Sequence, residues 1–288
     1  AFHGGGMEVE SIGVVGAGQM GAGIAQVAAC SGYQVTMADI NEEAVSRGMD
    51  TIRSSLQKLT SRGKISQQTA ASALGCISTT VSIQELGGSD LVVEAVPEIK
   101  ELKTRTFEQL DELCKDEAIL ATNTSSISID SIASSTNRPG RVIGMHFMNP
   151  VPVMKLVEVI KGTHTEPEVT AEVTRVIESL GKTPLECNDS PGFVSNRILC
   201  PMINEAIITL DEGVADPEAI DGIMKLGMNH PIGPLALADL IGLDTVLNIM
   251  RVLHEGLADD KYKPAPLLVS MVEEGKLGRK TKKGFYEY

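Results

Sequence analysis

The sequence predicts an α/β fold in which a doubly wound sheet is followed by an all-helical C-terminal domain. Short apolar runs of strand type alternate with helical patterns as far as residue 188, as expected for a parallel sheet with helices on both faces. A glycine-rich turn joins the first strand to the first helix. After residue 188 only helical patterns broken by Gly and Pro remain. We therefore expect a sheet domain at residues 1–188 and a helical domain at residues 189–288.

The first strand, turn and helix are typical of a dinucleotide-binding unit. An apolar strand at residues 12–15 precedes Gly16, Gly18 and Gly21, which have the G-x-G-x-x-G spacing, and a helical pattern follows at residues 20–30. The first glycine makes the tight turn, the second lets the backbone approach a pyrophosphate, and the third lets helix pack on strand. The helix N-terminus favours the anion. This unit predicts a Rossmann-type NAD-binding domain whose turn contacts the cofactor through Gly16, Ala17, Gly18, Gln19, Met20 and Gly21.

Asp39 follows the next predicted strand, at residues 34–38, and lies 21 positions after Gly18. A carboxylate about 20 residues beyond the turn accepts a hydrogen bond from the ribose of NAD. The four residues after Asp39 include no Arg or Lys that could hold the 2′-phosphate of NADP. We therefore expect NAD to be preferred over NADP. A buried glycine turn without a ligand is the alternative explanation of the motif.

Helix caps and apolar runs define the remaining elements. Asn41 and Ser66 can cap helices at residues 41–59 and 66–74. The runs DLVVEAV and AILATNT are typical of strands buried on both faces. In the sheet domain we expect further helices at 100–114 and 167–180 and strands at 76–80, 90–96, 118–124, 141–147, 155–161 and 183–187. In the helical domain we expect helices at 194–210, 216–226, 235–254 and 267–274.

Three strand ends should form one crevice, because ligands of doubly wound sheets bind beyond the carboxyl ends of the strands. These ends are residues 94–98, 123–126 and 146–149. Ser125 can donate a hydrogen bond to a substrate oxygen there, or it can cap the segment that follows. Asn196, in the first turns of the helix that opens the second domain, is expected to project over the crevice. Its alternative role is that of a polar residue at a helix start.

A histidine and a glutamate are predicted to pair in this crevice. If strands 141–147 and 154–161 form a hairpin centred on Pro152, residues whose numbers sum to 304 face each other. Glu158 then lies opposite His146. A carboxylate in that position can orient a histidine base and stabilise its protonated form.

The composition of the chain argues against several classes of binding partner. The formal net charge of −13 and the absence of Trp argue against nucleic acids and anionic membranes, and no apolar run approaches the ~20 residues of a membrane span. The five cysteines show no CxxC or metal-ligand spacing, so we expect reduced thiols in an intracellular compartment and no metal site. Residues 1–6, AFHGGG, are interpreted as a tag or a processed terminus.

One segment, residues 47–64, is basic although the chain as a whole is acidic. Five Lys or Arg residues against one Asp give it a charge of +4. A solvated helix face and a patch for a phosphate-rich ligand are both open interpretations. The residues concerned are Arg47, Arg53, Lys58, Arg62 and Lys64.

The chain also contains the segments GAGQMGAGIAQ, NTSSIS, GMHFMNPVPVMKLVEV, DSPGFVSNRIL, HPIGPLALADLIGLD and GRKTKKGFYEY. Together they resemble the 3-hydroxyacyl-CoA dehydrogenase family, particularly its short single-function 3-hydroxybutyryl-CoA members. The resemblance implies interconversion of (S)-3-hydroxyacyl-CoA and 3-oxoacyl-CoA with NAD, in fatty-acid β-oxidation or butanoate metabolism. It further implies a homodimer formed through the helical domain. Such an enzyme is cytoplasmic in a bacterium and otherwise peroxisomal or mitochondrial.

The resemblance assigns roles residue by residue. His146 resembles the family's general base and Glu158 its carboxylate partner, while Ser125 and Asn196 match residues that bind the substrate oxygens. Further contacts with NAD are implied at Glu98, Lys103, Ser125, Asn149 and Lys280, and contacts with coenzyme A at Ser55 and Arg62. Arg62 stands where we expect the family to carry Lys.

Two alternative functions remain open. Other 3-hydroxyacid dehydrogenases of the same layout, such as those for 3-hydroxyisobutyrate or 6-phosphogluconate, use a catalytic Lys, and the His146–Glu158 pair argues against them. A non-enzymatic NAD-binding protein resembling lens lambda-crystallin would carry the same motifs without using them.

Overall fold

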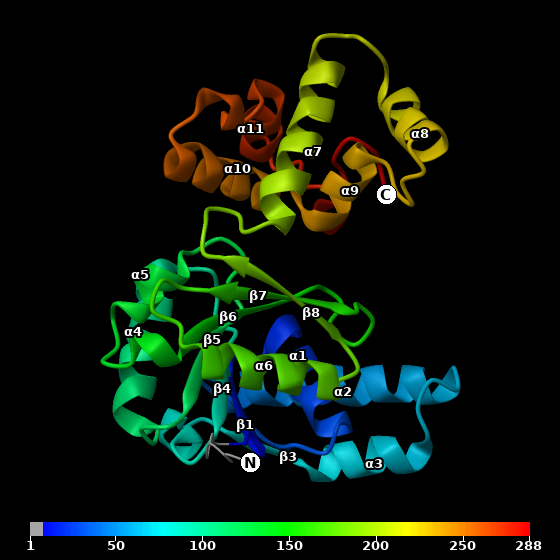
Figure 1. The fold of residues 1–288 in the computed structure, drawn as a ribbon. Helices are drawn as coiled ribbons and strands as arrows, with labels where there is room; N and C mark the ends of the chain where they lie inside the picture. Colours follow the sequence, from blue (N-terminus) through cyan, green and yellow to red (C-terminus); the bar gives the residue numbers. More distant parts are fainter. Residues whose placement is uncertain (1–7) are drawn as a thin grey trace. The chain divides into compact units, whose positions relative to one another are not determined.

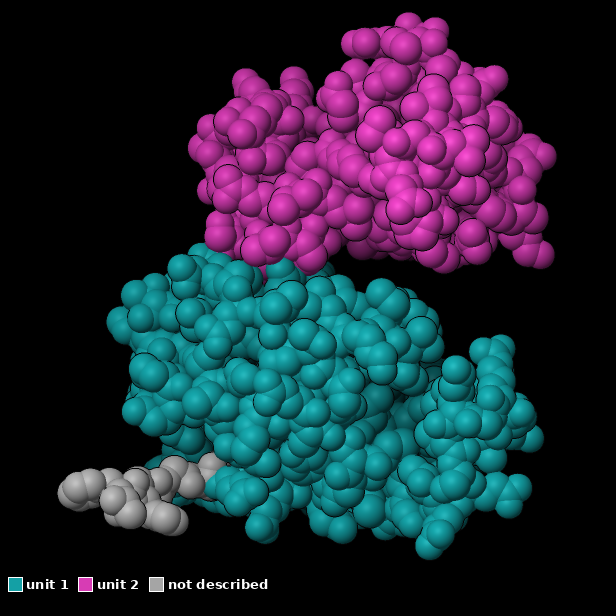
Figure 2. Space-filling view, turned by 45° about the vertical axis from the view of Figure 1, so that its right-hand side comes forward, with its two compact units in different colours: residues 1–189 teal, residues 190–288 magenta. Residues whose placement is uncertain are grey.

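The structure is a computed structural model that describes residues 8–288. The interpretation of residues 1–6 as a tag or processed terminus lies outside the described residues. The chain divides into two compact units, one ending at Asp189 and the other beginning at Ser190 (Figure 2). The division predicted from sequence lies one residue earlier. One unit is built on a sheet and the other is helical (Figure 1).

The sheet unit has the predicted alternation of strands and helices. Its strands are β1 (Ser11–Val15), β2 (Gln34–Ala38), β3 (Ile77–Thr80), β4 (Leu91–Glu94), β5 (Ile119–Thr122), β6 (Val142–Phe147), β7 (Leu156–Lys161) and β8 (Thr183–Asn188). Its helices are α1 (Gln19–Cys30), α2 (Glu42–Ser61), α3 (Gln67–Gly75), α4 (Lys100–Leu113), α5 (Ile129–Ala133) and α6 (Pro167–Ser179), with short 3-10 turns η1 (Ile83–Leu86) and η2 (Pro139–Arg141). Asn41 and Ser66 cap α2 and α3 through hydrogen bonds of 2.8 Å and 3.0 Å, as predicted.

The eight strands form one sheet in the order β3-β2-β1-β4-β5-β6-β7-β8. The first six strands in this order are parallel, β6 and β7 pair antiparallel, and β8 runs parallel to β7. In the β6–β7 register Met145 faces Val159 and His146 faces Glu158. These pairs sum to 304, so the predicted hairpin register is confirmed.

Helices cover both faces of the sheet. On one face α1, α2 and α6 share a buried apolar cluster with Val14 and Met145 of the strands. On the other face α5 packs against β6, where a Cβ added at Gly144 would lie 2.9 Å from Cδ1 of Ile129. Gly144 and Met145 face opposite sides because successive strand residues alternate. Figure 1 shows α4 and α5 together at one side of the sheet. The predicted doubly wound fold is therefore confirmed.

The second unit consists of helices apart from isolated bridges near the C-terminus, as predicted. Its elements are α7 (Ser195–Asp211), α8 (Pro217–Gly227), α9 (Pro234–Ile241), α10 (Leu243–Leu257), η3 (Asp260–Tyr262), α11 (Pro266–Glu273) and η4 (Arg279–Thr281). The single helix expected at residues 235–254 is wrong. Gly242 has φ +102°, a conformation that interrupts a helix and favours glycine, so α9 ends there and α10 begins. Within residues 8–288, none of the helices combines the length and the apolar character needed to cross a membrane.

Two buried carboxylates hold the C-terminal segment in this unit. Asp239, only 1% exposed, accepts hydrogen bonds from the amide of Tyr286 and the hydroxyl of Tyr288. Asp221 accepts from the Tyr286 hydroxyl at 2.6 Å. Burial raises the pKa of Tyr286 and the Asp221 carboxylate raises it further, so the phenol stays protonated as a donor. The segment that carries Lys280 is thereby anchored.

Candidate active site

The glycine-rich turn forms an open anion site at the start of α1. Gly16 has φ +104°, and its N–H donates to the carbonyl of Ala38 at 2.8 Å. A Cβ at Gly21 would lie 1.8 Å from the Gly16 carbonyl oxygen, so helix and turn meet only because that residue lacks a side chain. Apart from Gly18 itself and its two chain neighbours, no described residue has an atom within 4 Å of the place where a Cβ of Gly18 would stand, and no side chain caps α1. The turn therefore fits the diphosphate of NAD.

Asp39 supports this turn directly, through contacts that were not predicted from sequence. Its Oδ2 accepts from the amide of Ala17 at 2.7 Å, and its Oδ1 accepts from the amide of Ile40 at 2.6 Å. A carboxylate has about four acceptor positions, so these bonds leave capacity for a ribose hydroxyl. The contact of Asp39 with ribose remains a prediction.

A buried ion pair fixes the loop after β4. Glu94 is 0% exposed, and its Oε2 lies 2.5 Å from Nζ of Lys103. Thr122 donates to the same carboxylate, and Lys103 also donates to the carbonyl of Val96 at 3.0 Å. Burial raises the pKa of Glu94, although Lys103 and Thr122 offset part of that effect. The ammonium of Lys103 thereby supports the loop, and its contact with NAD, which the resemblance implies, stays a prediction.

Glu98 connects this loop to the loop after β5. Its Oε1 accepts from the hydroxyl of Thr124 at 2.5 Å, and its Oε2 accepts from the amide and hydroxyl of Ser125 at 2.9 Å and 3.0 Å. The strand ends at residues 94–98 and 123–126 therefore converge, as predicted. The residue that caps α5 is Ser128, which accepts from the amide of Ser131. The alternative in which Ser125 serves as the helix cap is wrong.

His146 and Glu158 form a buried pair at the end of the hairpin. Nδ1 of the imidazole lies 2.9 Å from Oε1 of the carboxylate. When Nδ1 donates to an ionised carboxylate, Nε2 of the neutral ring is the nitrogen that can accept a further proton. The end of β6 is held by Asn123, whose Oδ1 accepts from the amide of Phe147 at 2.9 Å. This arrangement suits a histidine base held in one orientation, and that role stays a prediction.

Asn149 lies three residues after His146, in the loop that joins β6 to β7. It is exposed and forms a cis peptide bond with Pro150. An exposed amide side chain beside the histidine suits a contact with the nicotinamide part of the cofactor, and that role stays a prediction.

The basic segment is only partly neutralised by its own helix. The arginines at positions 47 and 53 form ion pairs with carboxylates of α2. Lys58, Arg62 and Lys64 take part in no ion pair with the part of the chain that the structure describes. Ser55, which is partly buried, lies on the same helix. The positive charge that remains is thus concentrated toward the C-terminal end of α2.

Two predicted residues, Asn196 and Lys280, belong to the helical unit. Asn196 is the second residue of α7, and its backbone N–H donates to the carbonyl of Gly192 at 3.1 Å. Lys280 forms an ion pair with Asp244 at 2.5 Å. Their contacts with substrate and cofactor stay predictions.

Sequence reasoning missed the two groups that hold these loops. A carboxylate inside the apolar run DLVVEAV was a usable signal for Glu94, because a charge is rarely buried without a partner. Thr124, within the NTSS segment, carried no comparable signal, since hydroxyls in loops are common.

Comparison with known proteins identifies matches over nearly the whole chain. The family model "3-hydroxyacyl-CoA dehydrogenase, NAD binding domain" matches residues 11–190, and "3-hydroxyacyl-CoA dehydrogenase, C-terminal domain" matches residues 192–288. A Deinococcus radiodurans protein named "Probable 3-hydroxybutyryl-CoA dehydrogenase" is 59% identical over 96% of this chain and 99% of its own. The 3-hydroxybutyryl-CoA dehydrogenase of Bradyrhizobium diazoefficiens is 50% identical over 97% of this chain and 96% of its own.

A solved structure has the same fold over nearly the whole chain. The crystal structure of (S)-3-hydroxybutyryl-CoA dehydrogenase from Ralstonia eutropha has a TM-score of 0.95 and 51% sequence identity, and the match covers 98% of this chain and 99% of that one. Dehydrogenases that depend on a catalytic Lys are therefore not the family to which the motifs point.

Proposed function

The chain belongs to the 3-hydroxyacyl-CoA dehydrogenase family of NAD-dependent oxidoreductases, and from that premise we propose that it interconverts (S)-3-hydroxybutyryl-CoA and acetoacetyl-CoA. The observation that carries the proposal is the buried His146–Glu158 pair at the same end of the sheet as the glycine turn. The names of the relatives support a short acyl chain, and they are compatible with a place in β-oxidation or butanoate metabolism.

In the proposed reaction, the residues of the sheet unit have separate roles. Bound NAD supplies the acceptor for the hydride of C3. His146 takes the proton of the 3-hydroxyl at Nε2, and Glu158 stabilises the imidazolium that results. General-base assistance of this kind contributes ~10²–10⁴ in rate. Ser125, whose hydroxyl is oriented by Glu98, holds a substrate oxygen.

Coenzyme A supplies the phosphates that make the substrate anionic, and we assign them to the C-terminal end of α2. Lys58, Arg62 and Lys64 are exposed there, and no ion pair among residues 8–288 neutralises them. An acidic protein needs such a local site, because its net charge of −13 repels a polyanion.

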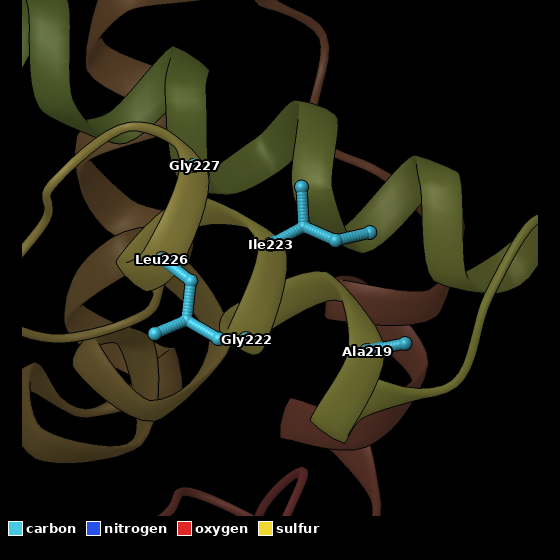
Figure 3. Close-up of a pocket in the computed structure, with 5 residues that line it drawn as sticks. All are labelled: Ala219, Gly222, Ile223, Leu226 and Gly227. Carbon is cyan, nitrogen blue, oxygen red and sulfur yellow. The ribbon is translucent and has the colours of Figure 1, made fainter.

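We further propose that the enzyme is a homodimer formed through the helical unit. Helix α8 exposes apolar side chains, with Ile223 60% and Leu226 91% exposed. A second copy of the chain would cover this face, which a soluble monomer would leave in water. Figure 3 shows these two side chains on an open groove that is lined by Ala219, Gly222, Ile223, Leu226 and Gly227.

Sedimentation analysis tests the dimer. Wild-type protein should sediment as a dimer, and Ile223→Glu combined with Leu226→Glu should yield a folded monomer. Lys225→Glu, an exposed charge change on the same helix, should leave the dimer intact. A wild-type monomer, or a double variant that remains dimeric, would contradict the proposed interface.

We also propose a reducing compartment, the cytoplasm in a bacterial source. The five cysteines are odd in number and show no CxxC spacing, and the two relatives described above are bacterial.

The decisive assay follows the absorbance of NADH with acetoacetyl-CoA. We expect turnover with the thioester. Free acetoacetate should be a far poorer substrate, because it lacks the coenzyme A group and the binding energy that this group contributes. Binding of NADH is measured separately through its own fluorescence, which is free of a tryptophan background because the chain contains no Trp. Binding without turnover on short or long 3-oxoacyl-CoA would favour the non-enzymatic, crystallin-like alternative.

A further inference from the structure

Lys182 is a buried lysine whose ammonium contacts backbone carbonyls. It follows Gly181 between α6 and β8 and is 8% exposed. Its Nζ donates to the carbonyl of Val151 at 2.6 Å and to that of Met154 at 2.5 Å. No carboxylate of residues 8–288 forms an ion pair with it. Buried lysines are rare without such a partner, and here the two carbonyls accept from the ammonium in place of a carboxylate.

Keeping the Lys182 side chain protonated in this environment costs free energy. Burial lowers the pKa of Lys182, and the neighbouring charge of Lys155 lowers it further. A hydrocarbon side chain would avoid that penalty, but it would leave the carbonyls of Val151 and Met154 without this donor.

The carbonyls belong to the loop 148–155, which joins the two strands of the catalytic hairpin. Within the loop, the amides of Val153 and Met154 both donate to the carbonyl of Pro150 at 3.0 Å. In this turn, the carbonyls of Val151 and Met154 point toward Lys182. The ammonium therefore fixes the conformation of a loop that has few backbone hydrogen bonds of its own.

The same loop contacts the nucleotide-binding helix on its other side. Val151 is 2% exposed, and a Cβ added at Gly23 of α1 would lie 2.8 Å from its Cβ. The loop is thus held between α1, which begins at the anion site, and the ammonium of Lys182. A shift of the loop would move the strand ends that carry His146 and Glu158 relative to α1.

We propose that Lys182 is a positioning residue for the reaction: by holding the loop 148–155, it fixes the His146–Glu158 pair relative to helix α1. The inference rests on the proposed function for its kinetic consequence. Its geometric part, that Lys182 orders the hairpin, stands independently of the substrate.

The kinetic experiment compares Lys182→Met with Lys155→Met, an exposed lysine of the loop itself. With acetoacetyl-CoA and NADH, Lys182→Met should lower kcat about tenfold or more, since a misplacement of ~1 Å can cost up to ~10²-fold. KM for acetoacetyl-CoA should change less than about threefold, because substrate affinity comes largely from remote contacts. Lys155→Met should retain wild-type kcat. A Lys182→Met enzyme with wild-type kcat, or an equal loss in both variants, would overturn the proposal.

Chemical rescue distinguishes the loss of the N–H donors of Lys182 from the loss of packing by its side chain. In Lys182→Ala, added methylammonium should raise kcat several-fold by replacing the lost N–H donors. Tetramethylammonium carries the charge but no N–H group, and it should have no effect. Equal rescue by both ions, or by neither, would argue against a donor role. Should Lys182→Met fail to fold, Lys182→Ala purified in methylammonium provides the same comparison, and kcat must then fall when the ion is dialysed away.

Hydrogen exchange provides a test that needs no substrate. Amides of residues 142–161 should exchange faster in Lys182→Met than in wild type, while Lys155→Met should match wild type. If wild-type protein shows no turnover, the proposed function fails, yet this comparison still decides whether Lys182 orders the hairpin. Unchanged exchange in Lys182→Met would refute the inference even in an active enzyme.

Discussion

His146 lies directly opposite Glu158 across β6 and β7, and its imidazole Nδ1 is 2.9 Å from the carboxylate Oε1. Side chains at directly opposed positions share one face of the sheet, so the strand register sets the separation of the pair. A register shift of one residue would move Glu158 to the other face. The hairpin backbone therefore preorganises the base.

The first prediction concerns this pair. His146→Gln and Glu158→Gln should each lower kcat by ~10²-fold or more, because one removes the proton acceptor and the other removes the group that orients it. Affinity for NADH should change little. Glu186→Gln, which alters an exposed carboxylate on β8, is the matched control and should keep wild-type kcat. Near-full kcat in either site variant would remove that residue from the mechanism.

The second prediction concerns cofactor choice. Asp39→Ser combined with Ile40→Arg should narrow or reverse the preference for NADH over NADPH, since it removes the repelling carboxylate and adds a cation. Ile40 is 85% exposed, so the arginine disturbs no packing. KM for NADH should also rise, because Asp39 supports the turn through the amide of Ala17. Ile40→Arg alone should still favour NADH. Wild-type preference for NADPH would show that the role of Asp39 is misassigned.

The third prediction concerns the phosphates of coenzyme A. Lys58→Glu with Arg62→Glu should raise KM for acetoacetyl-CoA several-fold at low salt. The effect should shrink as salt is added, because exposed charges are screened over ~10 Å at 0.1 M. Arg47→Glu with Arg53→Glu changes the net charge equally on the same helix, but these arginines are already paired. If KM for acetoacetyl-CoA at low salt is unchanged in both double variants, the basic segment is only a solvated helix face.

The fourth prediction concerns acid stability. Burial would raise the pKa of Asp90, but hydrogen bonds from Lys115 and from the amides of Glu10 and Ser11 outweigh it and hold the pKa below its usual value. A lowered carboxyl pKa stabilises the fold above the unfolded-state value of ~3.9, and that stabilisation is lost as pH falls through the folded-state pKa.

Urea unfolding between pH 5 and pH 2.5 measures this contribution. The free energy of unfolding of wild type should fall more steeply below about pH 4 than that of Asp90→Asn, which lacks the titrating group. Parallel curves for the two proteins would mean that Asp90 carries no share of the acid sensitivity.

The sheet and the histidine pair could be predicted from sequence because each depends on local patterns. Apolar runs and capping residues define the elements, and Pro152 between two strands was enough to place His146 opposite Glu158. The break at Gly242 could not be predicted in the same way. Apolar periodicity continues across it, and only the left-handed backbone of the folded chain separates α9 from α10.

Supporting contacts between distant segments were the hardest part of the site to predict. Lys182 lies 28 residues from Met154 and 31 from Val151, and no motif links them. Glu98 lies 27 residues from Ser125, and its bonds to that residue depend on two loops meeting in space. Such contacts follow from the order of the strands in the sheet, which a single sequence does not encode as a pattern.

The antiparallel turn from β6 to β7 also affects the order in which the site can assemble during folding. His146 and Glu158 are only 12 residues apart, whereas Glu98 and Ser125 are 27 apart. The entropic cost of closing a loop rises by ~0.6 kcal/mol for each doubling of its length, and contacts that are local in sequence tend to form fast. The hairpin can therefore bring the histidine and its carboxylate together before β4 and β5 have aligned their loops. Burial of the pair must then wait for these slower long-range contacts.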